Sequence, residues 1–276
     1  MRCFPRAPGI LTISFGIAEG HFLMAVKVDI VIRSYYRDLD WLRYCLRSID
    51  RFCSDFHRVL VVVPESCRER IRRSPLDGIE VTYCPNYADD YLGQQVTKLY
   101  ADTLSEADYI LHVDSDCTFK LPVRPADFFS EGRPQLMITP NEFFRINPPW
   151  QRETERALGF AVNFDYMRRH PHVYPRWLYG ELRAHIRAYH GRELADYVLA
   201  QPPQGFSEFN AMGALAHHHF PNEFSWEKWF SSDYDEKFCR IHWSWGGLTP
   251  EIRKELEAIL SNSGPPAVRK IKGAKR

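Results

Sequence analysis

The first 120 residues alternate short apolar runs with amphipathic stretches. The apolar runs predict strands at 28–32, 58–63, 79–83 and 109–113. Between them, apolar residues recur at helical spacing from Leu39 to Ile49 and over 92–105, which predicts two helices. Asp38 stands where it can cap the first of these helices. Strands that alternate with helices indicate a parallel sheet with right-handed crossovers.

Beyond residue 120 the pattern is less regular and richer in aromatic residues. Strands are predicted at 136–139 and 239–243, and helices at 151–159, 175–190, 191–200 and from Thr249 onward. Residues 205–219 are predicted to be a turn that leads into an apolar helix. The sequence contains no internal repeat, and no linker divides it before residue 264. We therefore expect a single domain of the α/β class, with a mostly parallel central sheet flanked by helices.

The expected domain covers residues 27–262 and consists of a first half, 27–120, and a second half, 121–262. A second start-like methionine, Met24, precedes the first strand, so residues 1–26 are predicted to be a dispensable N-terminal extension. The last ten residues include five basic ones, and residues 263–276 are predicted to form a disordered basic tail.

Composition, net charge and cysteine pattern limit the classes of protein to which this chain can belong. With 45% hydrophobic and 14% aromatic residues in 276, the chain can bury a sizeable core, and its net charge of +1 gives no global attraction to nucleic acid or to an anionic membrane. Seven cysteines without a Cys-x-x-Cys pair suit reduced thiols, so a cytoplasmic protein is expected. No segment approaches the roughly 20 apolar residues that a membrane-spanning helix needs, and no span is predicted.

Asp114 and Asp116 follow the apolar run that ends at Val113. The carboxyl ends of parallel strands form the ligand crevice of such sheets, so both side chains are expected there. Two neighbouring carboxylates repel each other and lose hydration, which packing alone does not favour. A hard divalent cation, Mn²⁺ or Mg²⁺, removes both objections. The alternative is that one aspartate caps the next turn.

Two families share features with this segment. The stretch His112–Thr118 contains Asp-x-Asp-x-Thr, which resembles the motif of haloacid-dehalogenase-like phosphatases, in which Asp114 would be the nucleophile. In that family the motif strand normally opens the catalytic domain, whereas here three predicted strands precede it. The acidic pair that the family needs later has one candidate, Asp233 and Asp235, which no apolar run precedes. This phosphatase remains the alternative hypothesis.

The second resemblance is to glycosyltransferases of the GT-A fold. It rests on the strand, loop and helix over 28–49, ending in Cys-Leu-Arg-Ser-Ile, and on the spacing to Asp114-Ser-Asp116. The segments Gln94–Leu99 and Phe206–Gly213 also resemble a DUF6492-like group of bacterial and phage proteins expected to be transferases. The resemblance covers roughly residues 27–250 and implies a GT-A-like (Rossmann-like) fold, with a nucleotide-binding half before an acceptor half.

The resemblance implies a metal-dependent, hexosyltransferase-like enzyme that moves a sugar from a nucleotide diphosphate sugar, with a UDP-sugar favoured, to an acceptor hydroxyl. Asp116 would ligate Mn²⁺ or Mg²⁺ directly, and Asp114 would hold the ribose or reach the metal through water. His242 would be the third metal ligand; its alternative is a histidine in a half-buried strand. A non-catalytic nucleotide-sugar-binding protein of the same fold is a further alternative.

Four residues are expected to contact the donor. Arg33 follows the first strand and is expected to pair with phosphate or sugar, while Tyr35 stacks on the base. Gln95 and Lys98 are three residues apart, hence on one helix face, and are expected near the donor sugar or diphosphate. The alternatives are an Arg33 paired with a neighbouring acid, such as Asp29, and a solvated helix face.

The acceptor half supplies the expected base. Glu208 is predicted to be the catalytic base of an inverting transfer, with Asp116 as the second catalytic residue, and its alternative is a capping acid behind Ser207. Aromatic residues of this half are expected to help bind the acceptor, with core packing as the alternative; they are Phe143, Phe144, Trp150, Trp226, Trp229, Trp243 and Trp245. The sequence leaves open whether that acceptor is a glycan, a metabolite or a modified base.

Overall fold

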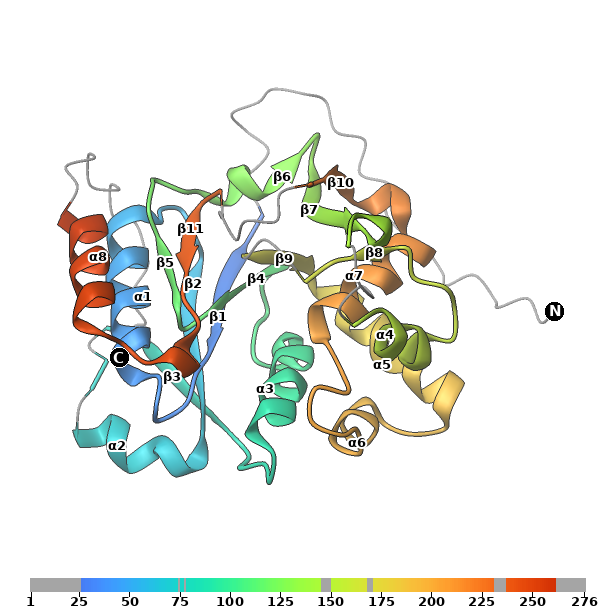
Figure 1. Cartoon of the computed structure of the whole chain (residues 1–276), viewed down its shortest axis with the longest axis horizontal. Helices are drawn as coiled ribbons and strands as arrows, with labels where there is room; N and C mark the ends of the chain where they lie inside the picture. Colours follow the sequence, from blue (N-terminus) through green and yellow to red (C-terminus); the bar gives the residue numbers. More distant parts are fainter. Residues whose placement is uncertain are drawn as a thin grey trace.

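The computed structural model describes residues 26–73, 75–76, 78–144, 150–167, 171–230 and 237–261. The predicted basic tail, residues 1–25 of the predicted extension, and both Asp233 and Asp235 lie outside the described residues. The described part has one main sheet with helices on both of its faces (Figure 1). The expected α/β class with a mostly parallel central sheet is therefore confirmed.

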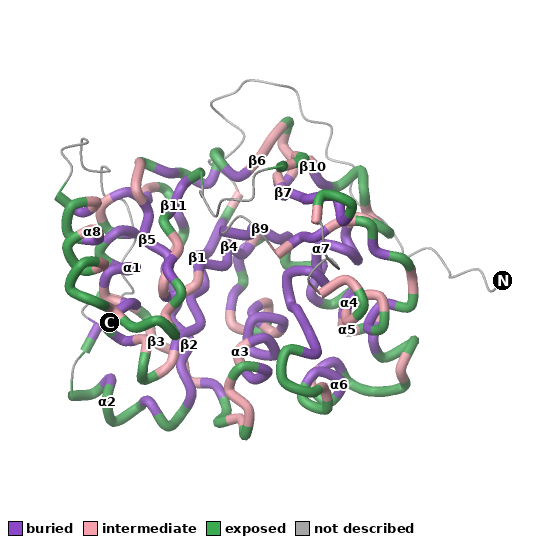
Figure 2. The backbone as a smooth tube through the Cα atoms, viewed as in Figure 1, coloured by how far each residue is buried: buried purple, intermediate pink, exposed green. Residues whose placement is uncertain are grey.

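The main sheet has the strand order β3-β2-β1-β4-β9. Its strands are β1 (Val28–Arg33), β2 (Arg58–Pro64), β3 (Glu80–Cys84), β4 (Tyr109–Asp114) and β9 (His172–Pro175). The first four pair in parallel, and β9 is added antiparallel to β4. All six residues of β1 are buried, because the central strands of such a sheet are covered on both faces (Figure 2).

Two hydrophobic clusters lie on opposite faces of this sheet. Ile30 and Ile32 of β1 belong to one cluster and Val31 to the other, as the alternation of side chains along a strand requires. The first cluster includes residues of α1 (Leu39–Phe52) and α8 (Pro250–Ser261), which pack side by side, and of α2 (Arg68–Arg73). The second cluster is covered by the helices α3 (Asp90–Leu99), α4 (Gln151–Leu158), α5 (Arg176–His190), α6 (Leu194–Leu199) and α7 (Glu208–His219) (Figure 1).

Short strands and 3₁₀ turns complete the described part of the chain. The strands β7 (Arg133–Pro140), β6 (Phe129–Ser130), β8 (Phe164–Asp165) and β10 (Ser225–Lys228) form a small sheet, and β5 (Cys117–Phe119) pairs antiparallel with β11 (Cys239–Ile241). Single 3₁₀ turns are η2 (Glu65–Cys67), η3 (Ala101–Thr103), η4 (Pro125–Phe128), η5 (Asn141–Phe143), η6 (Pro221–Glu223) and η7 (Ser244–Gly246). Of these strands, the sequence predicted only β7 and β11, since two to four residues are too few to show a period.

The start of α3 and the capping of α1 differ from the prediction. The helix expected at 92–105 begins at Asp90, because the Asp89 carboxylate accepts hydrogen bonds from the N–H groups of Tyr91 and Leu92, and it ends at Leu99. Asp38 occupies the N-cap position of α1, but its side chain makes no capping hydrogen bond. The Asp38 carboxylate interacts with Ser244 instead.

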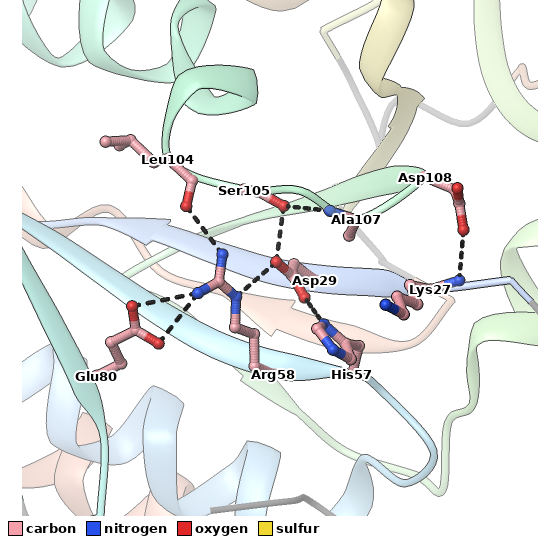
Figure 3. A network of polar contacts seen from close by, with 9 residues as sticks. All are labelled: Lys27, Asp29, His57, Arg58, Glu80, Leu104, Ser105, Ala107 and Asp108. Atoms are coloured by element: carbon pink, nitrogen blue, oxygen red, sulfur yellow. Dashed lines mark hydrogen bonds and ion pairs between the residues drawn. The ribbon is translucent and has the colours of Figure 1, made fainter. Parts of the chain in front are cut away.

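The amino ends of the central strands carry a closed polar network (Figure 3). Asp29 is fully buried and is met by His57 Nδ1 at 2.7 Å, Arg58 Nε at 2.8 Å and Ser105 Oγ at 2.7 Å. Arg58 also donates to Glu80 at 3.2 Å. The predicted alternative of an Arg33–Asp29 pair is therefore wrong: the two side chains lie at opposite ends of β1.

Candidate active site at the carboxyl ends of β1 and β4

The candidate site lies where the strand order changes direction. The chain runs from β1 outward to β2 and β3, then returns to place β4 on the other side of β1. Ligands of open α/β sheets bind at such a switch point, outside the carboxyl ends of the strands. Arg33, the last residue of β1, is paired in register with Asp114, the last residue of β4. The predicted donor residue and the first predicted metal ligand are thus neighbours.

A buried lysine joins the two halves of the chain. Lys98 Nζ lies 2.7 Å from Asp114 Oδ1 and 2.9 Å from Glu208 Oε1, and its side chain is 5% exposed. Burial alone lowers the pKa of Lys98, but the two carboxylates outweigh burial and the net direction is upward. The ammonium also lies 4.8 Å from the centre of the Phe209 ring, within cation–π range. The alternative of a solvated helix face is therefore wrong for this residue.

Gln95 sits on the same face of α3 and is also buried. Its Oε1 accepts a hydrogen bond from the backbone N–H of Glu208 at 3.1 Å. Because this N–H belongs to the first turn of α7, it has no partner within the helix. Gln95 therefore positions the start of α7, and Glu208 reaches Lys98 from there. Ser207 occupies the N-cap position without making a side-chain capping bond.

Arg33 is buried and paired with an acid. Its guanidinium forms a two-pronged ion pair with Asp90, which is 36% exposed, and the NH1–Oδ2 distance is 2.9 Å. This pair ties the end of β1 to the start of α3. The Nε atom of Arg33 and the hydroxyl of the adjacent Ser34 are buried without a hydrogen-bond partner. Such groups are costly to bury, so they mark a place where a ligand would restore lost hydrogen bonds.

Asp116 and Asp38 meet at Ser244. The backbone N–H of Ser244 donates to Asp116 Oδ2 at 3.0 Å, and the Ser244 side chain hydrogen-bonds to Asp38. Burial and the nearby Asp114 raise the pKa of Asp116 to about 7, although the Ser244 bond opposes the shift. Burial likewise raises the pKa of Asp38 to about 6. Both carboxylates thus resist ionisation in their present surroundings.

Negative charge exceeds positive charge in this crevice. Its carboxylates belong to Asp38, Asp90, Asp114, Asp116 and Glu208. The cations that face them are Arg33 and Lys98, so the named groups sum to −3 when all are ionised. The raised pKa values of two of the acids are the physical consequence of this excess and of burial. We call these seven residues the acidic crevice.

The acidic crevice suits a hard divalent cation. Asp114 and Asp116 supply the oxygen donors that such ions prefer, and a cation would relieve their repulsion. His242 is placed differently: its backbone N–H donates to Asp116 O at 3.1 Å, while its ring packs against Trp41 and Nε2 lies 4.0 Å from Glu255. Within the described ranges, no group of three or more His, Cys, Asp or Glu side chains forms a ready-made metal site.

The remaining predicted residue, Tyr35, is half-buried in the loop after β1. Its ring meets Tyr36 edge to face at 5.5 Å, and burial raises its pKa. Asp38 was missed as a site residue, since its position before a helix predicts a cap. The pairing of Asp90 with Arg33 spans 57 residues, so no local pattern in the sequence indicates it. Ser244 carries no sequence signal at all.

Together, fold and site define an α/β protein with a cluster of five carboxylates and two cations at the switch point of its sheet. The chain belongs to DUF6492, a family of unknown function whose model matches residues 23–257. Comparison with curated proteins gives no match.

Solved structures of the glycosyltransferase GlyE of Streptococcus pneumoniae TIGR4 are similar in part. One is 12% identical with a TM-score of 0.41, and the apo form is 11% identical with a TM-score of 0.42. Each match covers 73% of this chain and 45% of the GlyE chain, so this chain spans less than half of GlyE. A likeness at this level does not define an activity.

Two further observations concern the whole chain. No helix among the described residues is both long enough and apolar enough to cross a membrane. Six cysteines within the described ranges are buried free thiols. The expected reduced state of these cysteines agrees with this arrangement.

Proposed function

We propose that this protein is a metal-dependent glycosyltransferase of the GT-A type, which moves a sugar from a nucleotide diphosphate sugar to an acceptor hydroxyl. One observation carries the proposal: Asp114 and Asp116 lie in an acidic crevice at the switch point between β1 and β4. A diphosphate is itself anionic and would be repelled by carboxylates that exceed their cations by three charges. A donor of this kind therefore enters together with a divalent cation, as the GT-A resemblance implies.

Asp114 and Asp116 would hold that cation, Mn²⁺ or Mg²⁺, with His242 as the proposed third ligand. When bound, it neutralises charge on the departing nucleoside diphosphate. Arg33 lies at the end of β1 with an unpartnered buried Nε, which supports its proposed contact with the donor phosphate or sugar. Tyr35, in the same loop, is the proposed stacking partner of the base, for which uracil is favoured.

Glu208 is the proposed base. Its carboxylate lies 2.9 Å from Lys98 Nζ, and this ion pair holds it in place. When the acceptor hydroxyl attacks the sugar and the bond to the diphosphate breaks, the hydroxyl proton passes to Glu208. Lys98 then still has Asp114 as a partner, so the protonated Glu208 leaves no unpaired buried cation. Gln95 holds the Glu208 backbone in place during this transfer.

The test is a thermal shift of the full chain with UDP-, GDP-, CDP- and dTDP-sugars, each with and without Mn²⁺. A donor at a hundredfold over its Kd stabilises the protein by about 2.7 kcal/mol. We expect a shift with at least one donor that needs Mn²⁺ and is lost in Asp116→Asn. Asp40→Asn, an exposed aspartate on α1, is the matched control and should keep the shift.

The same samples separate the alternatives. Release of the nucleoside diphosphate establishes turnover, whereas a Mn²⁺-dependent shift without release indicates a binding protein. Hydrolysis of p-nitrophenyl phosphate that is lost in Asp114→Asn would instead support the phosphatase. If no donor shifts the melting temperature in the presence of Mn²⁺, the proposed function is wrong.

A further inference from the structure

Two tryptophans at the edge of the acidic crevice are left uncovered. Trp245 is 84% exposed, more than any other large hydrophobic side chain in the described part of the chain, and Trp243 is 51% exposed. Their ring centres lie 6.4 Å apart with the planes tilted by 46°. Large aromatic side chains bury more apolar area than most residues when they pack, so packing does not account for this pair.

The pair is fixed to the crevice by the residue between them. Ser244 gives its N–H to Asp116 and its side chain to Asp38. The turn η7 is closed by two backbone bonds of 2.9 Å, from Gly246 N–H to Trp243 O and from Gly247 N–H to Ser244 O. Gly247 has a φ of 78°, a conformation that favours glycine and ends the turn. The turn that carries the two tryptophans is therefore fastened to Asp116 through its backbone, while the two indoles stay exposed.

Exposed indoles on a turn that is bound to a carboxylate of the acidic crevice suit one class of ligand. A pyranose ring has an apolar C–H face, which stacks on an aromatic ring, and hydroxyl groups at its edge, which donate to carboxylates. An anionic partner, such as a nucleic-acid backbone or an acidic membrane surface, would instead meet the excess negative charge of the crevice. The combination favours a neutral carbohydrate.

Building on the proposed function, we infer that Trp243 and Trp245 form the acceptor subsite and that the acceptor is a carbohydrate whose pyranose ring stacks on these indoles. Ser244 acts as the positioning residue, because it sets the indoles relative to Asp116. Of the three acceptors that the sequence leaves open, a glycan, a metabolite and a modified base, this inference selects the glycan.

The experiment is saturation-transfer NMR on the full chain with UDP and Mg²⁺ present, because paramagnetic Mn²⁺ would broaden the ligand signals. The probes are the methyl glycosides of glucose, galactose and N-acetylglucosamine, and lactose. We expect transfer to the ring C–H protons of at least one probe and a loss of at least tenfold in Trp245→Ala, with a smaller loss in Trp243→Ala. Trp177→Ala is the matched control: Trp177 is 43% exposed but lies on α5 against Phe220, and its loss should leave the transfer unchanged.

The readouts keep the two proposals apart. The Mn²⁺-dependent shift with UDP should persist in Trp245→Ala, which also shows that the variant is folded, and disappear in Asp116→Asn. If UDP binds but no sugar receives saturation, or if Trp245→Ala leaves the transfer unchanged, the acceptor subsite is wrong while the donor site stands. Loss of transfer to the uracil protons in Trp245→Ala would place the nucleotide on the indoles and overturn the inference. Sugar binding without any nucleotide shift would support the subsite and contradict the proposed donor.

Discussion

The two ends of strand β1 differ in how completely their buried charged and polar groups are paired. At the amino end, Asp29 is met by three donors, and the surrounding acids and bases are paired (Figure 3). At the carboxyl end, the acidic crevice holds more carboxylates than cations, and Arg33 Nε and Ser34 Oγ lack partners. A satisfied network of this kind stabilises a fold, whereas an unsatisfied one costs stability and is typical of a binding site.

The difference teaches how to separate structural from functional acids in this chain. Both Asp29 and Glu208 are buried beside a cation. Each cation also serves a second carboxylate, Glu80 at Arg58 and Asp114 at Lys98, but only the Lys98 group lies among further acids at the carboxyl ends of the strands. Burial and pairing therefore do not distinguish the two roles, but the balance of charge around the pair does.

The largest effect is expected at the amino end. Asp29→Asn removes the charge that Arg58 and His57 face, and a broken buried pair costs about 3–5 kcal/mol. Urea unfolding should show this loss in the free energy of unfolding. The control is Asp108→Asn, an exposed acid that accepts from the Lys27 N–H in the same region, with an expected change of about 0.5 kcal/mol or less. Equal effects of the two variants would contradict a structural role for the Asp29 network.

The second effect is expected at Lys98. Lys98→Met leaves Asp114 and Glu208 without their shared cation, and we expect a loss of about 3 kcal/mol in the free energy of unfolding. The double variant Lys98→Met/Glu208→Gln should recover at least about 1 kcal/mol, because one of the two stranded charges is gone. Urea unfolding of the four proteins in this cycle measures the coupling. Strict additivity would show that Lys98 and Glu208 do not interact in solution.

Much of the first half, residues 27–120, could be predicted from the sequence. The strands ending at Arg33 and Asp114 are apolar runs of five to six residues, and their parallel pairing follows from the intervening helices. The positions of Lys98 and Asp114 near the crevice also follow, because one lies on the helix that precedes β4 and the other at the end of β4. The local pattern of apolar residues is sufficient to predict these elements and the places of Lys98 and Asp114.

The partners of these residues could not be predicted in the same way. Lys98 meets Glu208 across 110 residues and Asp116 meets Ser244 across 128, and no local pattern records such contacts. Asp38 was read as a cap because the helix start is local, while its link to Ser244 is not. Short strands such as β9 were missed since their pairing with β4, rather than their composition, makes them strands.

The smallest effect, and the most specific, concerns the protonation of Asp116. Its pKa is about 7 in the folded protein, against an ordinary value of 3.8. At a pH between these two values, the folded state therefore keeps a proton that the unfolded state has released. The free energy of unfolding that this group contributes is therefore present below about pH 4 and is lost as the pH rises to about 7. Asp38, with a pKa of about 6, adds to the same trend.

Asp116→Asn removes this dependence, because the amide cannot ionise. The variant should match the wild type near pH 4 and exceed it at pH 8 by on the order of 1–2 kcal/mol, a value reduced from the full pKa shift by solvent screening. Urea unfolding at the two pH values measures the difference, and Asp40→Asn serves as the control with no change in slope. Adding Mn²⁺ at pH 8 should stabilise the wild type alone, since the ion takes the place of the proton between Asp114 and Asp116. If the wild type remains less stable than Asp116→Asn in saturating Mn²⁺, the excess negative charge of the acidic crevice does not serve to bind a cation. The contrast with the paired Asp29 network would then say nothing about function.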